Sequence, residues 1–219
     1  MERAVKGDFF SGLPVAELVV KLSLVVPAVE DRFGKAQLAG PVLTFPDDLS
    51  PEAAAAKFSN EGTIQGSFRP LNTIIGMWII QECRRDWIKA GIEMSWDEIV
   101  MAAREAAPLR SIINPDAPQF YAGGNMVQKI KDFCRDTNQP VPESVGEIAR
   151  CVYESLALKY RNALEGLEAM KGQRIDSLNI VGGPINNRFL DQLIADSLDR
   201  TVVTGPVEGA AIGNLLTQA

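Results

Sequence analysis

The chain of 219 residues contains no histidine, and this absence excludes several kinds of chemistry. Ser-His-Asp and Cys-His sites need an imidazole as their general base, and most zinc sites use one as a ligand. Any chemistry in this chain must therefore rest on carboxylates, backbone amides, hydroxyls, thiols or basic side chains. We assign no catalytic residue and no metal ligand from the sequence.

Cysteine is also scarce, with only Cys83, Cys134 and Cys151 in the chain. An odd and sparse set of cysteines is typical of an intracellular protein whose thiols stay mostly reduced. No apolar run reaches the length of about 18 residues that a membrane helix needs, and the first ten residues lack the apolar stretch of a signal peptide. The sequence therefore predicts a cytoplasmic protein that has no membrane partner.

Positive charge is in the minority, with 22 basic against 28 acidic residues and a net charge of −6. Since no dense basic cluster occurs either, nucleic acid is not an expected partner. Apolar residues make up 46% of the chain and charged residues 23%, which is ordinary for a globular protein. The length suits one large domain or two small ones.

Two helices are predicted in the first half of the chain from caps and apolar spacing. Ser50 is a good N-cap before Pro51, and the helix that it begins is expected to end near Phe58. The segment 71–91 carries apolar residues at helical spacing and is predicted to be one long helix. The segment 15–26 is either a short buried helix or a strand, since Pro27 ends it in both cases.

Capping boxes mark two further helices, because a serine is followed three residues later by a glutamate. Ser95 with Glu98 predicts a helix that ends by Pro108, and Ser144 with Glu147 predicts the longest helix of the chain. A short helix is expected between them over 126–137.

The last forty residues alternate between strand and helix. Residues 177–181 and 201–204 are apolar and predict strands, with a helix over 186–198 between them and another helix after the second strand. This alternation is typical of α/β architecture with parallel strands.

A glycine pair, Gly182–Gly183, stands at the turn between the first of these strands and its helix. The first turn of a helix exposes unpaired N–H groups and a partial positive charge, and glycine lets a ligand approach the backbone closely. The turn could hold a phosphate or the edge of a nucleotide, or it could simply need glycine for its dihedral angles. Neither the dinucleotide fingerprint nor the P-loop pattern is present.

Several longer motifs, in register with one another, carry a family resemblance. The segments "FSNEGTIQG", "NTIIGMWIIQECRRDW", "IINPDAPQF", "CRDTNQPVPES" and "SLNIVGGPINNRFLDQLIADS" resemble the C-terminal domain of the FGGY carbohydrate kinases, and within that family the rhamnulokinases. The resemblance divides the chain into a poorly matched segment, 1–40, and a kinase C-terminal domain, 41–219.

The resemblance implies an α/β fold of the actin-like ATPase type, built from ribonuclease-H-like domains, with helical insertions. It implies phosphoryl transfer from ATP, with Mg²⁺, to a ketose such as L-rhamnulose. The family's nucleotide contacts fall on five positions of this chain: Thr73, Gln81, Gly182, Gly183 and Asn187.

The family resemblance also implies a disulfide between Cys134 and Cys151. The residues alone leave a second reading open, in which both are buried thiols in a reducing compartment.

The chain departs from the family pattern at the turn and in its catalytic parts. Pro184 replaces a third glycine and removes one N–H donor, and Thr73 replaces an asparagine. No His-Asp-Thr motif with the family's base and no Ser-Gly-Thr phosphate turn occurs, although phosphoryl transfer needs such parts. We therefore expect a chain that is inactive alone, with an adenine nucleotide and either a missing N-terminal kinase half or a second copy as partners. The alternative is a non-catalytic module that senses nucleotide or binds a partner.

Overall fold

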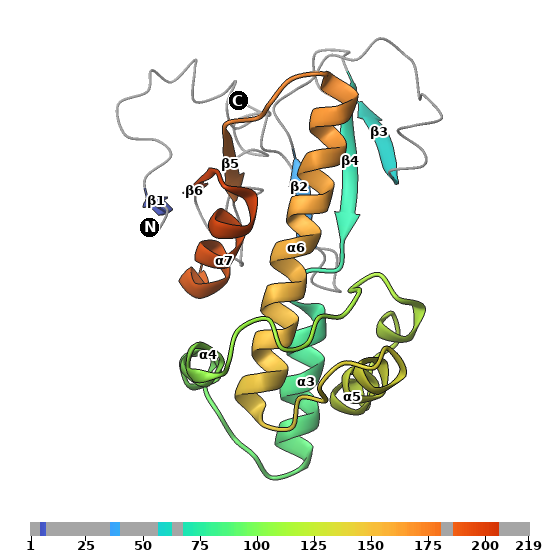
Figure 1. Cartoon of the computed structure of the whole chain (residues 1–219), viewed down its shortest axis with the longest axis vertical. Helices are drawn as coiled ribbons and strands as arrows, with labels where there is room; N and C mark the ends of the chain where they lie inside the picture. The colour runs from blue at the N-terminus through green and yellow to red at the C-terminus, as the bar shows by residue number, and fades with distance from the viewer. Residues whose placement is uncertain (1–4, 8–35, 40–56, 63–67, 181–185, 206–219) are drawn as a thin grey trace, which may run out of the picture.

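The computed structural model describes residues 5–7, 36–39, 57–62, 68–180 and 186–205. Two small sheets lie at one end of the molecule and a group of helices at the other, and one long helix runs between them (Figure 1). The expected elements over 15–26 and 206–219 and the Gly182–Gly183 turn lie outside the described residues.

The strands form one parallel and one antiparallel sheet. The parallel sheet has the order β1-β6-β5, from β1 (Val5–Gly7), β6 (Thr201–Thr204) and β5 (Ser177–Ile180). The antiparallel sheet has the order β2-β4-β3, from β2 (Ala36–Ala39), β4 (Phe68–Ile74) and β3 (Phe58–Gly62). The predicted parallel strands over 177–181 and 201–204 are confirmed, within the described residues.

The helices follow the capping signals of the sequence. They are α3 (Trp78–Lys89), α4 (Trp96–Glu105), α5 (Met126–Asp136), α6 (Val145–Lys171) and α7 (Arg188–Leu198), with the 3₁₀ turn η1 (Pro118–Phe120) before α5. Both predicted capping boxes are formed, at Ser95 and at Ser144. The 27 residues of α6 give it a length of about 40 Å, which lets it touch α4 at one end and α7 and β4 further along.

The prediction of one helix over 71–91 is wrong in its first third. Residues up to Ile74 belong to β4, and α3 begins only at Trp78. The β-branched Thr73 and Ile74 suit a strand, and the strand pairs with β2 and β3 on its two sides. The pairing of β4 with β2 and β3 therefore decides the structure of these residues, because their local apolar pattern suits a helix or a strand equally.

The helix expected to run to Phe58 is also wrong at its end. Lys57 lies in a turn with a positive φ of 60°, and Phe58 begins β3. The earlier residues of that expected helix, 50–56, lie outside the described residues. A buried amide explains the turn, since the Nδ2 of Asn72 donates a hydrogen bond of 3.3 Å to the carbonyl of Lys57.

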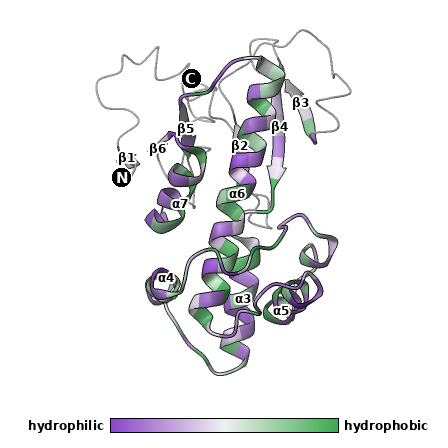
Figure 2. Cartoon of the chain, viewed as in Figure 1, coloured by the Kyte–Doolittle hydropathy of each residue, from purple (hydrophilic) through white to green (hydrophobic). Residues whose placement is uncertain are grey.

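A single apolar core joins the helices and reaches the sheets. Apolar and polar residues alternate along α3 and α6, as Figure 2 shows by hydropathy. The apolar sides meet in the interior, where Ile79, Ile80, Ile130, Ile148 and Leu156 are almost completely buried.

Candidate functional site

The N-terminus of α3 carries two of the positions assigned to nucleotide binding. Thr73 is exposed near the end of β4, and Gln81 is half-buried in the first turn of the helix. The N-cap residue Met77 makes no side-chain cap, and no acidic residue occupies the first turn. Because the first N–H groups of a helix carry partial positive charge, this end can accept a polar or anionic ligand group.

The N-terminus of α7 carries the third described position, Asn187. Its Oδ1 accepts a hydrogen bond of 3.1 Å from the backbone N–H of Leu190, so the side chain caps the helix. Its Nδ2 is buried and meets no hydrogen-bond partner among the described residues. The structure thus shows Asn187 as a helix cap, while its role toward a nucleotide stays a prediction.

Tyr153 of α6 lies between these two helices. Its ring meets Phe189 of α7 edge-on, with 6.2 Å between the centroids, and its hydroxyl is buried. Burial raises the pKa of Tyr153, while the Asn187 side chain acts in the opposite direction and nearby Cys83 of α3 adds to the rise. Tyr153 is therefore close to both α3, which carries Gln81, and α7, which Asn187 caps.

Asp191 adds a buried carboxyl group one turn after the cap of α7. Neither carboxyl oxygen has a hydrogen-bond partner in the part of the chain that the structure describes, and the side chain is 0% exposed. Burial raises its pKa to about 7, against the opposing effect of Arg188. Sequence reasoning missed Tyr153 and Asp191, because both occupy positions that the helical pattern assigns to the core.

The two family-implied cysteines are brought together by α5 and α6. Cys134 and Cys151 are both buried free thiols in this structure. Their hydrogen bond is the main cause that lowers the pKa of Cys134 and raises that of Cys151. The proximity suits the predicted disulfide, which itself stays a prediction.

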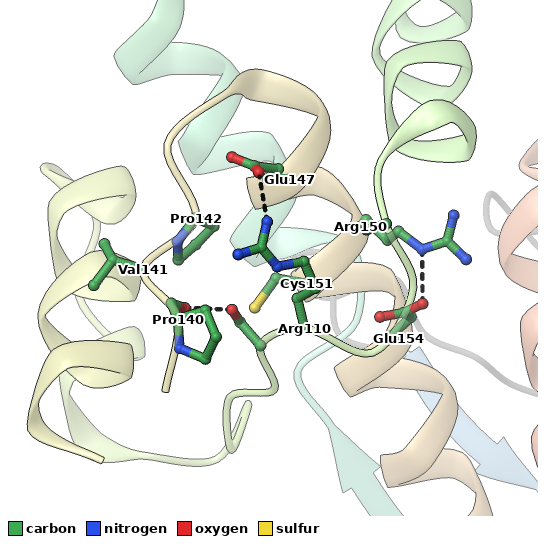
Figure 3. A pocket seen from close by; sticks show the side chains of 10 residues that line it. Arg110, Pro140, Val141, Pro142, Glu147, Arg150, Cys151 and Glu154 are labelled. Atoms are coloured by element: carbon green, nitrogen blue, oxygen red, sulfur yellow. Dashed lines mark hydrogen bonds and ion pairs between the residues drawn. The ribbon is translucent and has the colours of Figure 1, made fainter. Parts of the chain in front are cut away.

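A shallow recess opens beside Cys151 on the N-terminal half of α6 (Figure 3). Arg110 lies 3.5 Å from Glu147 across it, and Arg150 lies 2.7 Å from Glu154. Since these charges pair with each other, the recess presents no uncompensated group to a ligand, and we do not include it in the site.

The described residues include one uncapped helix N-terminus, that of α3, where no side chain accepts a hydrogen bond from the first N–H groups. The N-terminus of α7 is capped by Asn187. No group of three or more acidic or cysteine side chains in the described part of the chain is arranged to hold a metal ion. No described helix is long and apolar enough to cross a membrane.

The sequence and the fold were compared with known proteins. The model of the family described as "FGGY family of carbohydrate kinases, C-terminal domain" matches residues 40–219. A rhamnulokinase of Bacteroides thetaiotaomicron is 41% identical over 199 residues, covering 89% of this chain and 40% of the relative. A rhamnulokinase of Enterococcus faecalis is 41% identical over 172 residues, covering 78% of this chain and 34% of the relative.

Solved structures agree in fold. The xylulose kinase of Rhodospirillum rubrum superposes with a TM-score of 0.55 at 16% identity, covering 82% of this chain and 35% of that chain. The xylulose kinase of Bifidobacterium adolescentis gives a TM-score of 0.50 at 19% identity, covering 90% of this chain and 38% of that chain. The predicted mixed α/β kinase fold is therefore confirmed. The chain spans only about two-fifths of the length of these proteins or less.

Proposed function

The chain belongs to the FGGY family of carbohydrate kinases, and from this membership we propose that it is the nucleotide-binding C-terminal portion of a rhamnulokinase-like enzyme. The reaction of such an enzyme is phosphoryl transfer from ATP to a hydroxyl of a ketose. The observation that carries the proposal is the 41% identity to a rhamnulokinase over 199 residues, which includes both helix N-termini of the site.

The described residues supply binding and orientation. We assign hydrogen bonds to the nucleoside to the hydroxyl of Thr73 and the carboxamide of Gln81 at α3, and to Asn187 at α7. The Gly182–Gly183 turn belongs to the same proposal but lies outside the described residues. ATP supplies the phosphoryl group, with Mg²⁺ expected to arrive on its phosphates, since no ligand set for the ion exists among the described side chains.

The chain is proposed to be inactive alone. Phosphoryl transfer needs a base aimed at the acceptor hydroxyl and donors around the phosphates. The chain has neither the His-Asp-Thr nor the Ser-Gly-Thr motif, and it covers only 40% of the rhamnulokinase that it matches. The division at residue 40 between a poorly matched segment and the kinase domain is part of the same proposal.

Calorimetry with adenosine, ADP and ATP in the presence of Mg²⁺ tests nucleotide binding. We expect all three to bind, and Gln81→Ala to weaken each by roughly fivefold, the effect of losing about one hydrogen bond. Gln128→Ala, on the exposed face of α5, is the matched control and should leave the affinity unchanged. The absence of heat with every nucleotide would overturn the binding proposal, and turnover of L-rhamnulose by the chain alone would overturn its inactivity.

A non-catalytic module that binds a partner is the second candidate. It is favoured by large apolar side chains on the surface, since Met101 of α4 is 61% exposed and Leu109 after it is 68% exposed. Light scattering after size exclusion separates the two candidates. A clean monomer without nucleotide binding would argue against both.

A further inference from the structure

Phe189 lies in the first turn of α7, two positions after the cap Asn187, and its partly buried ring packs against the core. Two guanidinium groups lie over this ring. The Cζ of Arg104, on α4, is 5.3 Å from the ring centroid, and the Cζ of Arg150, on α6, is 5.5 Å from it. Both distances are within the range of about 6 Å at which a cation is attracted to an aromatic face. Since Tyr153 of α6 also meets the ring edge-on, α4 and α6 hold the first turn of α7 through one side chain.

The guanidinium group of Arg150 is itself fixed by two helices. Its Nε donates a hydrogen bond of 2.7 Å to Glu154, one turn further along α6. Its Nη1 donates to three carbonyls at the C-terminal end of α4, those of Ala103 (3.2 Å), Arg104 (3.1 Å) and Ala106 (2.9 Å). These carbonyls carry partial negative charge, which favours a cation at this end. The side chain is only 13% exposed, so the ring meets a cation whose position α4 and α6 determine.

The cap of α7 surrounds Phe189 in the sequence. The Oδ1 of Asn187 accepts its hydrogen bond from the N–H of Leu190, the residue directly after Phe189. A displacement of Phe189 therefore moves both ends of this bond and turns the carboxamide of Asn187. If the ring contacts are lost, the turn can adopt other arrangements, and only a fraction of the molecules holds Asn187 in the orientation that binds. The apparent affinity for a ligand of Asn187 falls by that fraction.

We propose that Phe189 is a positioning residue, which sets the orientation of the Asn187 carboxamide toward the nucleoside. The inference rests on the proposed function, in which Asn187 binds the nucleoside. Phe189 acts through Asn187 and is assigned no contact with the nucleotide. The face of its ring carries this role in addition to its apolar volume, because the attraction of Arg104 and Arg150 arises from the quadrupole of the ring.

Phe189→Leu tests the proposal, because leucine keeps an apolar side chain and removes the aromatic face. Calorimetry should show that adenosine, ADP and ATP with Mg²⁺ each bind roughly fivefold more weakly, the size of one partly exposed cation–π contact. Phe189→Tyr keeps the ring and should restore the affinity. Leu193→Ala is the matched control, since Leu193 packs against the core one turn further along α7. It should lower the urea midpoint at least as much as Phe189→Leu and leave the affinity unchanged.

Amide exchange without nucleotide adds a readout at the cap itself. In Phe189→Leu the protection factor of the Leu190 amide should fall, because this N–H donates to Asn187. The amide of Ile194, in the interior of the same helix, should keep its protection.

Three results would overturn the inference in a wild-type chain that binds nucleotide. They are an unchanged affinity in Phe189→Leu, an equal loss of affinity in Leu193→Ala, and a Phe189→Tyr variant as weak as Phe189→Leu. The second would show that the stability of α7 alone causes the effect. A wild-type chain that binds no nucleotide would overturn the proposed function and this inference with it, so the two failures are distinguishable.

Discussion

At the residue scale, Asp191 places a carboxyl group in the packed interface between α6 and α7. The side chain is 0% exposed, both oxygens lack a partner among the described side chains and backbone groups, and its pKa is raised to about 7 by burial. The charges and titratable groups around it are Arg188 on its own helix and Tyr160 on α6, whose own pKa burial and Asp191 both raise. The folded protein therefore holds the proton of Asp191 more tightly than the unfolded chain does.

This proton affinity predicts a stability that falls as pH rises. The contribution of Asp191 to the free energy of unfolding is fully present below about pH 4, where the carboxyl group is protonated in both the folded and the unfolded state. This contribution, about 4 kcal/mol in total, is lost as the pH rises through about 7. Asp191→Asn should flatten this part of the profile and raise stability above pH 7. Urea unfolding at pH values between 4 and 8 measures this pH dependence of the free energy of unfolding.

The exposed Asp196 of the same helix provides the control, since Asp196→Asn should keep the slope of the wild type. An Asp191→Asn profile as steep as that of the wild type would show that another group causes the slope.

The thiols of Cys134 and Cys151 carry a second prediction at this scale. Their contact makes a disulfide feasible, and closing a loop of this size stabilises a fold by about 3 kcal/mol. We expect one free thiol, that of Cys83, when the unreduced protein is titrated in denaturant, and three after reduction. Cys134→Ser should then show two free thiols without reduction. Three free thiols in the unreduced wild type would rule out the bridge.

At the scale of elements, the sequence predicts what local signals determine. The capping serines, Ser95 and Ser144, and the strand–helix–strand order of 177–204 are reproduced because caps and short apolar runs act within a few residues. The start of α3 is misplaced because the pairing of β4 with β2 and β3 depends on residues far along the chain. For the same reason the ring contact of Tyr153 with Phe189 has no signature in either helix alone.

The packing of α4 against α6 depends on one glycine. A Cβ at Gly146 would lie 2.4 Å from the carbonyl oxygen of Ala102, a backbone atom that cannot move without moving α4. Gly146→Ala should therefore lower the free energy of unfolding by about 2 kcal/mol, although alanine favours the helix by about 1 kcal/mol. Chemical denaturation measures the difference.

Asn162→Ala is the control for helix propensity, because Asn162 is exposed on the same helix. It should raise stability slightly, by a few tenths of a kcal/mol. A stabilised Gly146→Ala variant would show that the two helices are further apart than this structure has them.

At the scale of the whole molecule, the proposed function depends on more chain than this sequence supplies to the match. The matched rhamnulokinase is more than twice as long as the part of it that this chain covers. If the rest of such an enzyme carries the base and the sugar site, neither part can transfer a phosphoryl group by itself. The two parts should do so only as a complex, because in-line transfer needs the nucleotide and the acceptor in a fixed mutual geometry.

Reconstitution measures this dependence directly. With the upstream fragment of a matched rhamnulokinase held constant, the rate of ATP-dependent phosphorylation of L-rhamnulose should rise with the concentration of this chain and reach a plateau. Gln128→Ala should give the same rates, whereas Gln81→Ala should need a roughly fivefold higher concentration of ATP for the same rate, because the substitution weakens nucleotide binding and leaves assembly intact. A stable complex with no turnover would instead show that this chain binds its partner without serving as the nucleotide-binding part of a kinase.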